Sequence, residues 1–136
     1  MDERTILVVD DDPEMRTLLV EVLCREGYAV EEASNGAEAL TRLRAKAIAV
    51  IIMDKNLPGL GGLYLLSGLR MICPDTPVIL ITTLADAATY LEGLKKGAFD
   101  YIFKPFRMGE LLQVLRRALL SGDRSSASSL VSGGAK

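Results

Sequence analysis

The sequence predicts a doubly wound α/β domain, in which helices cover both faces of a parallel β-sheet. Five short apolar runs alternate with five segments of helical periodicity. This alternation is typical of parallel strands joined by crossover helices. The run at residues 50–53 is unbroken and partly β-branched, as expected of a central strand that is covered on both faces.

The composition fits one folded domain. The chain has 136 residues, of which 49% are apolar, so it can bury a full core. The net charge is -2 and no Lys/Arg stripe is present. Charge therefore does not favour direct binding to nucleic acid or to an anionic membrane.

The sequence indicates a cytoplasmic protein. Residues 1–4 are charged rather than typical of a signal peptide, and no apolar run approaches the ~20 residues of a membrane span. Cys24 and Cys73 lie far apart on stretches of helical periodicity, so we expect reduced thiols. The chain has no histidine, which removes the commonest metal ligand and general base.

The first strand is expected at residues 5–9, followed by a helix that begins at Pro13. Asp12 has the position of that helix's N-cap, and Gly27 that of its stop. The next apolar run, at residues 28–33, is weaker and more alternating. We therefore expect this strand at an edge of the sheet.

The second helix begins with Asn35 and Glu38 at the spacing of a capping box and extends to about Lys46. After the strand that ends in Asp54, the remaining elements are expected at residues 60–72 (helix), 78–81 (strand), 84–97 (helix), 101–103 (strand) and 108–120 (helix). The residues expected to face the core from the helix at 60–72 are Leu63, Leu66, Leu69 and Ile72.

The composition changes near the C-terminus. Residues 121–136 are rich in Ser and Gly, which is typical of flexible linkers. We therefore expect a folded domain at residues 1–120 and a flexible tail or linker at 121–136.

Polar residues follow the apolar runs directly. Asp10 and Asp11 follow the first run, Asp54 the third, Thr82 the fourth and Lys104 the fifth. In doubly wound sheets the ligand site lies beyond the carboxyl ends of the strands. Each residue alone fits ordinary turn or surface chemistry, but together they predict a site at this edge.

Such a cluster needs cations. Two carboxylates 4 Å apart repel by roughly 4 kcal/mol at an effective dielectric constant of about 20. Lys104 can supply one positive charge, and the oxygen ligands favour Mg²⁺ for the rest. A carboxylate beside Mg²⁺, a lysine and a hydroxyl suits attack on a phosphoryl group, with Asp54 forming an acyl phosphate.

Four sequence blocks, at residues 8–11, 53–59, 81–82 and 97–106, resemble the signature blocks of receiver domains of bacterial two-component response regulators. The resemblance covers about residues 4–120. It implies the flavodoxin-like fold, a (βα)5 domain with strand order 2-1-3-4-5.

The resemblance also implies a role in phosphorelay signal transduction. Asp54 would accept the phosphoryl group of a sensor histidine kinase or a histidine phosphotransfer protein. Asp11, Asp54 and the backbone carbonyl of Asn56 would bind Mg²⁺ directly, and Asp10 would act largely through water. The chain would be a phosphoacceptor that assists its own phosphorylation and dephosphorylation, and not an enzyme.

The implied switch depends on the phosphoryl group. Thr82 would bond one of its oxygens and Lys104 would pair with it. The movement of Thr82 would then let Tyr101 turn from outward to inward. The output surface would comprise the fourth helix, the fifth strand and the fifth helix.

Three further positions matter in the family. The Lys104–Pro105 bond is a candidate cis peptide. Thr83 is bulkier than the small residue that usually follows the family threonine, which is Thr82 here. Thr83 and Leu84 lie where the lifetime of the phosphorylated form is tuned.

The resemblance leaves the downstream partner open. The effector domain is either absent from this chain, which we favour, or replaced by a separate target protein. Phosphorylation-dependent formation of a homodimer stays open as well.

Two other functions fit part of the pattern. A Mg²⁺-dependent phosphohydrolase of the haloacid dehalogenase type would use Asp10 and Asp12, but Asp12 has the position of a helix cap and no second acidic pair follows downstream. An interaction module without phosphorylation would require loss of site residues, and none is lost.

Overall fold

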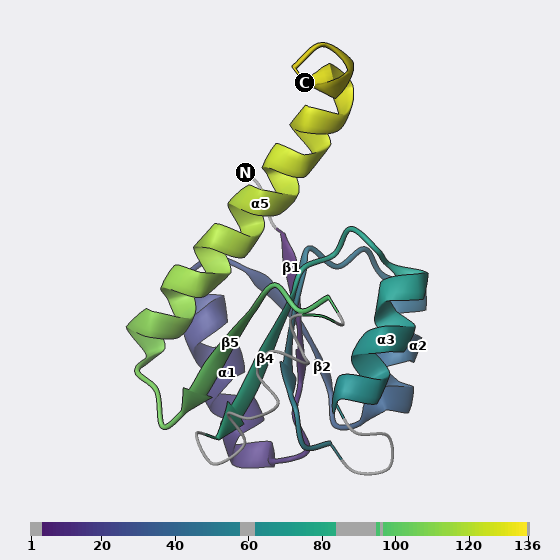
Figure 1. Cartoon of the computed structure of the whole chain (residues 1–136). Helices are drawn as coiled ribbons and strands as arrows, with labels where there is room; N and C mark the ends of the chain where they lie inside the picture. Colours follow the sequence, from purple (N-terminus) through teal and green to yellow (C-terminus); the bar gives the residue numbers. More distant parts are fainter. Residues whose placement is uncertain (1–3, 58–61, 84–94, 96, 136) are drawn as a thin grey trace.

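The computed structural model describes residues 4–57, 62–83, 95 and 97–135, and these residues form a sheet with helices on both of its faces (Figure 1). The strands are β1 (Thr5–Val9), β2 (Ala29–Ala33), β3 (Val50–Asp54), β4 (Val78–Thr83) and β5 (Asp100–Lys104). All neighbouring strands are parallel, in the order β2-β1-β3-β4-β5. The predicted doubly wound fold and its strand order 2-1-3-4-5 are confirmed.

The described helices are α1 (Pro13–Arg25), α2 (Gly36–Ala45), α3 (Gly62–Ile72) and α5 (Met108–Ala135). In Figure 1, α1 and α5 cover one face of the sheet, and α2 and α3 cover the other. The side chains of β1 alternate between these layers: Ile6 and Val8 pack with α1 and α5, whereas Leu7 and Val9 pack with α2 and α3. The helix expected at residues 84–97 lies almost wholly outside the described residues.

The predicted caps explain where the first two helices begin. The Asp12 side chain accepts a hydrogen bond from the Glu14 N–H, and Pro13 occupies the first turn of α1. Asn35 caps α2 by accepting from the Glu38 N–H. Glu38 reaches back to Ser34 rather than to Asn35, since its Oε1 accepts from the Ser34 N–H at 2.7 Å and from the hydroxyl at 2.9 Å.

One expectation about the core-facing side of α3 was wrong. Ile72 does not face the core, because its side chain is 53% exposed. Leu66 and Leu69 are buried as expected, and Leu65 is buried with them. These three residues share a helix face because residues three and four apart lie on the same side of a helix. The side chain of Leu63 lies outside the described residues.

The last helix does not end near residue 120 as expected. The backbone of α5 stays helical to Ala135, and the sequence contains no proline in this segment to interrupt it. That residues 121–136 form a flexible linker stays a prediction. Within the described part of the chain, no helix is long and apolar enough to cross a membrane.

Arg70 connects α3 to the segment that leads into β5. Its guanidinium donates hydrogen bonds to the carbonyl oxygens of Cys73 at 2.6 Å, Thr76 at 2.5 Å and Gly97 at 3.1 Å. Gly97 has φ +107°, and a Cβ there would lie 2.4 Å from the Arg70 Cδ. The turn before β5 therefore requires glycine for its backbone conformation and for the close approach of Arg70.

Replacing Gly97 with Ala should lower the free energy of unfolding by about 1–3 kcal/mol, because alanine is strained in the left-handed region and would displace Arg70. Gly68→Ala is the matched control. A Cβ at Gly68 meets nothing within 4 Å, and alanine in a helix is favoured over glycine by about 0.5–1 kcal/mol. Urea unfolding monitored by circular dichroism measures both changes, and equal effects of the two substitutions would contradict this account.

Candidate functional site

The sheet brings together four polar residues that the sequence placed at strand ends. Asp10 follows β1 directly, Asp54 ends β3, Thr82 lies one residue before the end of β4, and Lys104 ends β5. The relative exposures of Asp10, Asp54 and Thr82 are 1%, 6% and 1%. Such burial is unusual for carboxylates, so these residues form an acidic pocket within the protein rather than a solvated surface patch.

The Asp54 carboxylate is held on both sides. Its Oδ2 lies 2.8 Å from the Lys104 Nζ, and its Oδ1 accepts a hydrogen bond from the Asn56 N–H at 2.7 Å. The side chains of Lys104 and Asp54 are 30% and 7% exposed. Lys104 therefore compensates a carboxylate that has lost most of its water.

Asp10 is fixed by its backbone and by one of its carboxylate oxygens. Its N–H donates to the Ala33 carbonyl at 3.0 Å, and its Oδ1 accepts from the Asp12 N–H at 2.9 Å. Its Oδ2 is buried and has no hydrogen-bond partner among the described residues. Burial raises the pKa of Asp10, as does the Asp54 charge, while the Asp12 hydrogen bond opposes the rise.

Lys104 experiences opposing influences. Burial is the largest single influence and lowers its pKa, but the Asp54 hydrogen bond and the charges of Asp54 and Asp10 outweigh burial. The net pKa of Lys104 is raised, so this side chain is cationic at neutral pH. The Thr82 Oγ1 is a second buried atom without a hydrogen-bond partner in the described structure.

The pocket fits a hard cation and a phosphoryl group. Buried polar atoms are nearly always satisfied, so the Asp10 Oδ2 and the Thr82 Oγ1 indicate where an ion or ligand oxygens would bind. The described residues contain no cluster of three His, Cys, Asp or Glu side chains that could hold a metal. Mg²⁺ usually binds through one or two carboxylates and keeps several waters, and Asp10 and Asp54 are the buried carboxylates of this pocket.

Other predicted site residues lie around this pocket. Asp11 is exposed in the turn before α1, and Thr83 is half-buried beside Lys104 in the strand register. The Lys104–Pro105 peptide bond is cis, as expected. Leu84 lies outside the described residues.

Tyr101 does not have the outward position that the expected switch would start from. It is 6% exposed and belongs to the apolar cluster that α2 and α3 cover. Its ring stacks on that of Phe103, with centroids 6.0 Å apart. These apolar contacts contribute to its burial.

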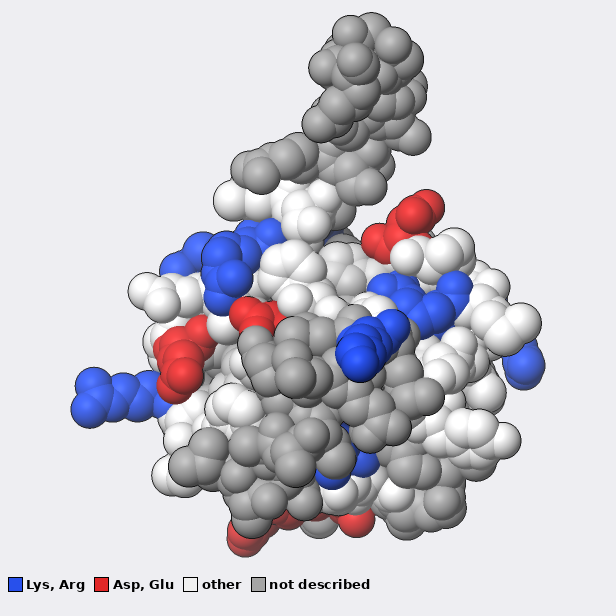
Figure 2. Space-filling model, viewed as in Figure 1, with Lys and Arg blue, Asp and Glu red and all other residues white. Residues whose placement is uncertain are grey.

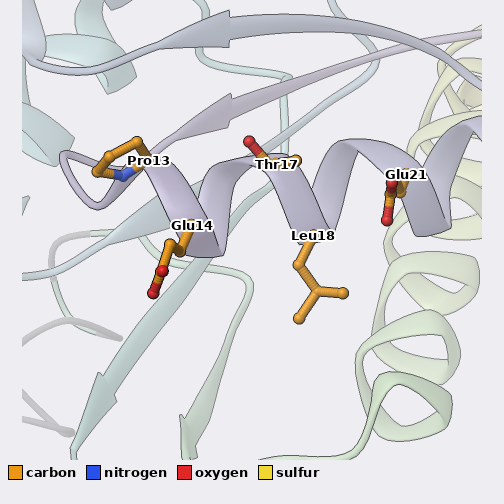
Figure 3. Close-up of a pocket in the computed structure, with 5 residues that line it drawn as sticks. All are labelled: Pro13, Glu14, Thr17, Leu18 and Glu21. Carbon is orange, nitrogen blue, oxygen red and sulfur yellow. The ribbon is translucent and has the colours of Figure 1, made fainter.

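Two surface hollows lie near α1, and neither Asp10 nor Asp54 lines them. The hollow in Figure 3 lies on the outer face of α1, where Pro13, Glu14, Thr17, Leu18 and Glu21 line it. A second hollow of about 440 Å³ lies beside the pocket and is mostly apolar. It is lined by Met15, Leu18, Lys104, Pro105, Phe106 and Met108.

A family model for the response regulator receiver domain matches residues 6–116. The chain belongs to the response-regulator receiver family. Receiver domains are signalling domains rather than ordinary enzymes, and they generally bind Mg²⁺ at the phosphorylation site. The family match favours a receiver over the haloacid dehalogenase alternative, and the Asp12 side chain caps α1.

Known proteins agree with this assignment. Regulatory protein AtoC of Escherichia coli K12 is 38% identical over 114 residues, which are 84% of this chain and 25% of AtoC. The DNA-binding transcriptional regulator NtrC of the same strain is 35% identical over 119 residues, 88% of this chain and 25% of NtrC. The chain thus spans about a quarter of these relatives.

Two solved structures have the same fold at similar identity. The receiver domain of NtrX from Brucella abortus gives a TM-score of 0.81 at 34% identity, covering 84% of this chain and 97% of that one. The chemotaxis response regulator CheY4 of Vibrio cholerae gives 0.81 at 33% identity, covering 87% and 100%. The likeness therefore extends over whole receiver domains.

Sequence reasoning missed Arg16. Its guanidinium donates from Nη1 to the Asp10 carbonyl at 2.6 Å and from Nε to the Glu32 Oε1 at 3.2 Å. The first acceptor is a backbone atom, which every residue carries. The sequence therefore offers no signal for this contact.

Replacing Asp10 with Asn should stabilise the protein in Mg²⁺-free buffer at pH 7, by about 1–3 kcal/mol, because the neutral amide removes a negative charge that burial and the nearby Asp54 carboxylate both disfavour. The pKa of Asp10 is raised in the folded state above its ordinary value of 3.8. The contribution of Asp10 to the free energy of unfolding is therefore complete below pH 3.8 and is lost as the pH rises through the raised pKa. The advantage of the variant should therefore be largest near neutral pH.

Urea unfolding with EDTA between about pH 4 and pH 8 measures this dependence. Asp75→Asn, at an exposed carboxylate, is the control and should change stability little. An Asp10→Asn variant that gains stability mainly at acidic pH would contradict the inferred charge state.

Proposed function

We propose that this chain is a phosphoacceptor whose Asp54 takes a phosphoryl group from the phosphohistidine of a sensor histidine kinase or a histidine phosphotransfer protein. The observation that carries the proposal is the Asp54–Lys104 pair, 2.8 Å apart. The Asp10 Oδ2 and the Thr82 Oγ1 are buried in the same pocket and have no hydrogen-bond partner among the described residues. Membership of the receiver family supports it.

The transfer is a displacement at phosphorus. An oxygen of the ionised Asp54 attacks the phosphorus atom, and the bond between phosphorus and the imidazole nitrogen breaks. The electron pair of that bond remains on the imidazole, and Asp54 becomes a mixed anhydride. Lys104 lies within reach of the negative phosphoryl oxygens, and the Thr82 hydroxyl can donate to one of them.

Mg²⁺ is the cofactor in this proposal. Asp11, Asp54 and the Asn56 carbonyl would hold it, with Asp10 acting largely through water, and it would neutralise charge on the phosphoryl oxygens. The raised pKa of Asp10 favours such an ion, because a cation would offset the carboxylate repulsion that contributes to the shift.

The phosphohistidine must approach beside Lys104. The hollow lined by Met15, Leu18, Phe106 and Met108 lies there and is mostly apolar, so it offers a contact surface to a partner protein. On the face shown in Figure 2, basic side chains are interspersed with acidic and uncharged ones. On this face the described side chains form no continuous basic stripe for the phosphates of a nucleic acid. We therefore propose no direct binding of nucleic acid by this domain.

The output would come from the surface of β5, α5 and the helix expected at residues 84–97. Thr82 would move toward the phosphoryl group and shift the packing around Tyr101, which is already buried in this structure. Thr83 and Leu84 would set the lifetime of the phosphorylated form. These roles rest on the family resemblance.

The partner that reads this output differs between receivers. NtrC is named as a DNA-binding transcriptional regulator and is about four times longer than the matched region. By analogy, this chain would act in the cytoplasm on an attached effector domain or on a separate target, with or without a phosphorylation-dependent homodimer.

Incubation with acetyl phosphate and Mg²⁺ tests the proposal. Intact-mass spectrometry should show one phosphoryl group added to the wild-type chain, and no addition to Asp54→Asn or in the presence of EDTA. Asp75→Asn should be labelled like the wild type, because Asp75 is an exposed carboxylate outside the pocket.

Two outcomes would refute this function. Continuous release of phosphate without a detectable adduct, abolished by Asp10→Asn, would indicate a phosphohydrolase. No labelling of the wild type under any Mg²⁺ concentration, with phosphohistidine donors included, would indicate an interaction module.

A further inference from the structure

Arg16 connects the acidic pocket to the edge of the sheet. It lies in the first turns of α1, and its side chain is 21% exposed. One nitrogen of its guanidinium donates to the carbonyl of Asp10, and another donates to the carboxylate of Glu32 on β2. Two segments that flank the pocket are thus held by one planar group.

The Asp10 carbonyl belongs to the peptide that joins Asp10 to Asp11. The Asp10 N–H donates a hydrogen bond to the Ala33 carbonyl, and the Asp10 Oδ1 accepts one from the Asp12 N–H. With Arg16 on the carbonyl at 2.6 Å, both backbone polar groups of Asp10 and one carboxylate oxygen have partners. The remaining oxygen, Oδ2, is buried and has no hydrogen-bond partner in the part of the chain that the structure describes.

Arginine suits this task better than other basic residues. Its donors are arranged in a rigid fork, so it can bind two acceptors on different segments at once, which a lysine ammonium does less well. The Glu32 carboxylate also balances the positive charge of Arg16, which would otherwise oppose a cation in the pocket. Exposed ion pairs contribute little to stability, so the Glu32 contact alone does not explain the arrangement.

We propose that Arg16 is a positioning residue for the divalent cation, acting through the Asp10 carbonyl to orient Asp10 and Asp11 without touching the ion. This inference rests on the proposed function, because it assumes that the pocket binds Mg²⁺. Groups that orient metal ligands typically change metal affinity by about 10–100-fold when they are removed. Arg16→Gln should therefore weaken Mg²⁺ binding by about that factor.

Isothermal titration with MgCl₂ measures the affinity without any phosphoryl donor. We expect Arg16→Gln to raise the Kd for Mg²⁺ by about 10–100-fold. The Kd of Arg16→Lys, which keeps the positive charge but has a single donor nitrogen, should fall between those of Arg16→Gln and the wild type. Arg25→Gln is the matched control, because Arg25 is exposed in the last turn of the same helix. Its Kd should equal that of the wild type.

Labelling with acetyl phosphate at varied Mg²⁺ provides a second readout that a merely structural role would not move. For Arg16→Gln, the Mg²⁺ concentration that half-saturates labelling should rise. The labelling rate at saturating Mg²⁺ should change by a smaller factor. Circular dichroism in EDTA checks the fold, and Arg16→Lys serves if Arg16→Gln does not fold.

The outcomes separate this inference from the proposed function. Wild-type affinity in both Arg16 variants would overturn the role of Arg16 and leave the proposed function standing, as would an effect confined to the rate at saturating Mg²⁺. A wild-type chain that binds no Mg²⁺ would remove the basis of both.

Discussion

The constraint on which the structure depends is the burial of two carboxylates, Asp10 and Asp54, at one edge of the sheet. Charged groups lose favourable hydration when they are buried, so each needs a compensating partner. Lys104, 2.8 Å from Asp54, supplies that partner for one of them. Among the described residues, Asp10 has one carboxylate oxygen without a partner, and its pKa is raised. The proposal of a bound cation rests on this uncompensated carboxylate.

The fold creates this constraint. Because all the strands are parallel, their carboxyl ends meet at one edge, and the register pairs Asp54 with Ile81 and Thr83 with Lys104. Three strands thus bring the Asp54 carboxylate, the Thr82 hydroxyl and the Lys104 ammonium to the same edge of the sheet. Arg70 and Gly97 define the start of β5, at whose far end Lys104 lies.

The sequence predicted those features that depend on side-chain pattern. Apolar runs indicated all five strands, Asp12 and Asn35 marked helix starts, and the polar residues after the runs indicated the pocket. Contacts to backbone carbonyls could not be predicted, because every residue offers the same acceptor. The bonds of Arg16 to Asp10 and of Arg70 to Gly97 therefore had no sequence signal.

The central claim is that the buried acceptor is Asp54, and chemical mapping of the labelled residue tests it most directly. Borohydride reduces an aspartyl phosphate to homoserine, which peptide mass spectrometry can locate after labelling with acetyl phosphate and Mg²⁺. We expect homoserine at position 54 alone. Homoserine at position 10 or 11, or a label resistant to borohydride, would contradict the account.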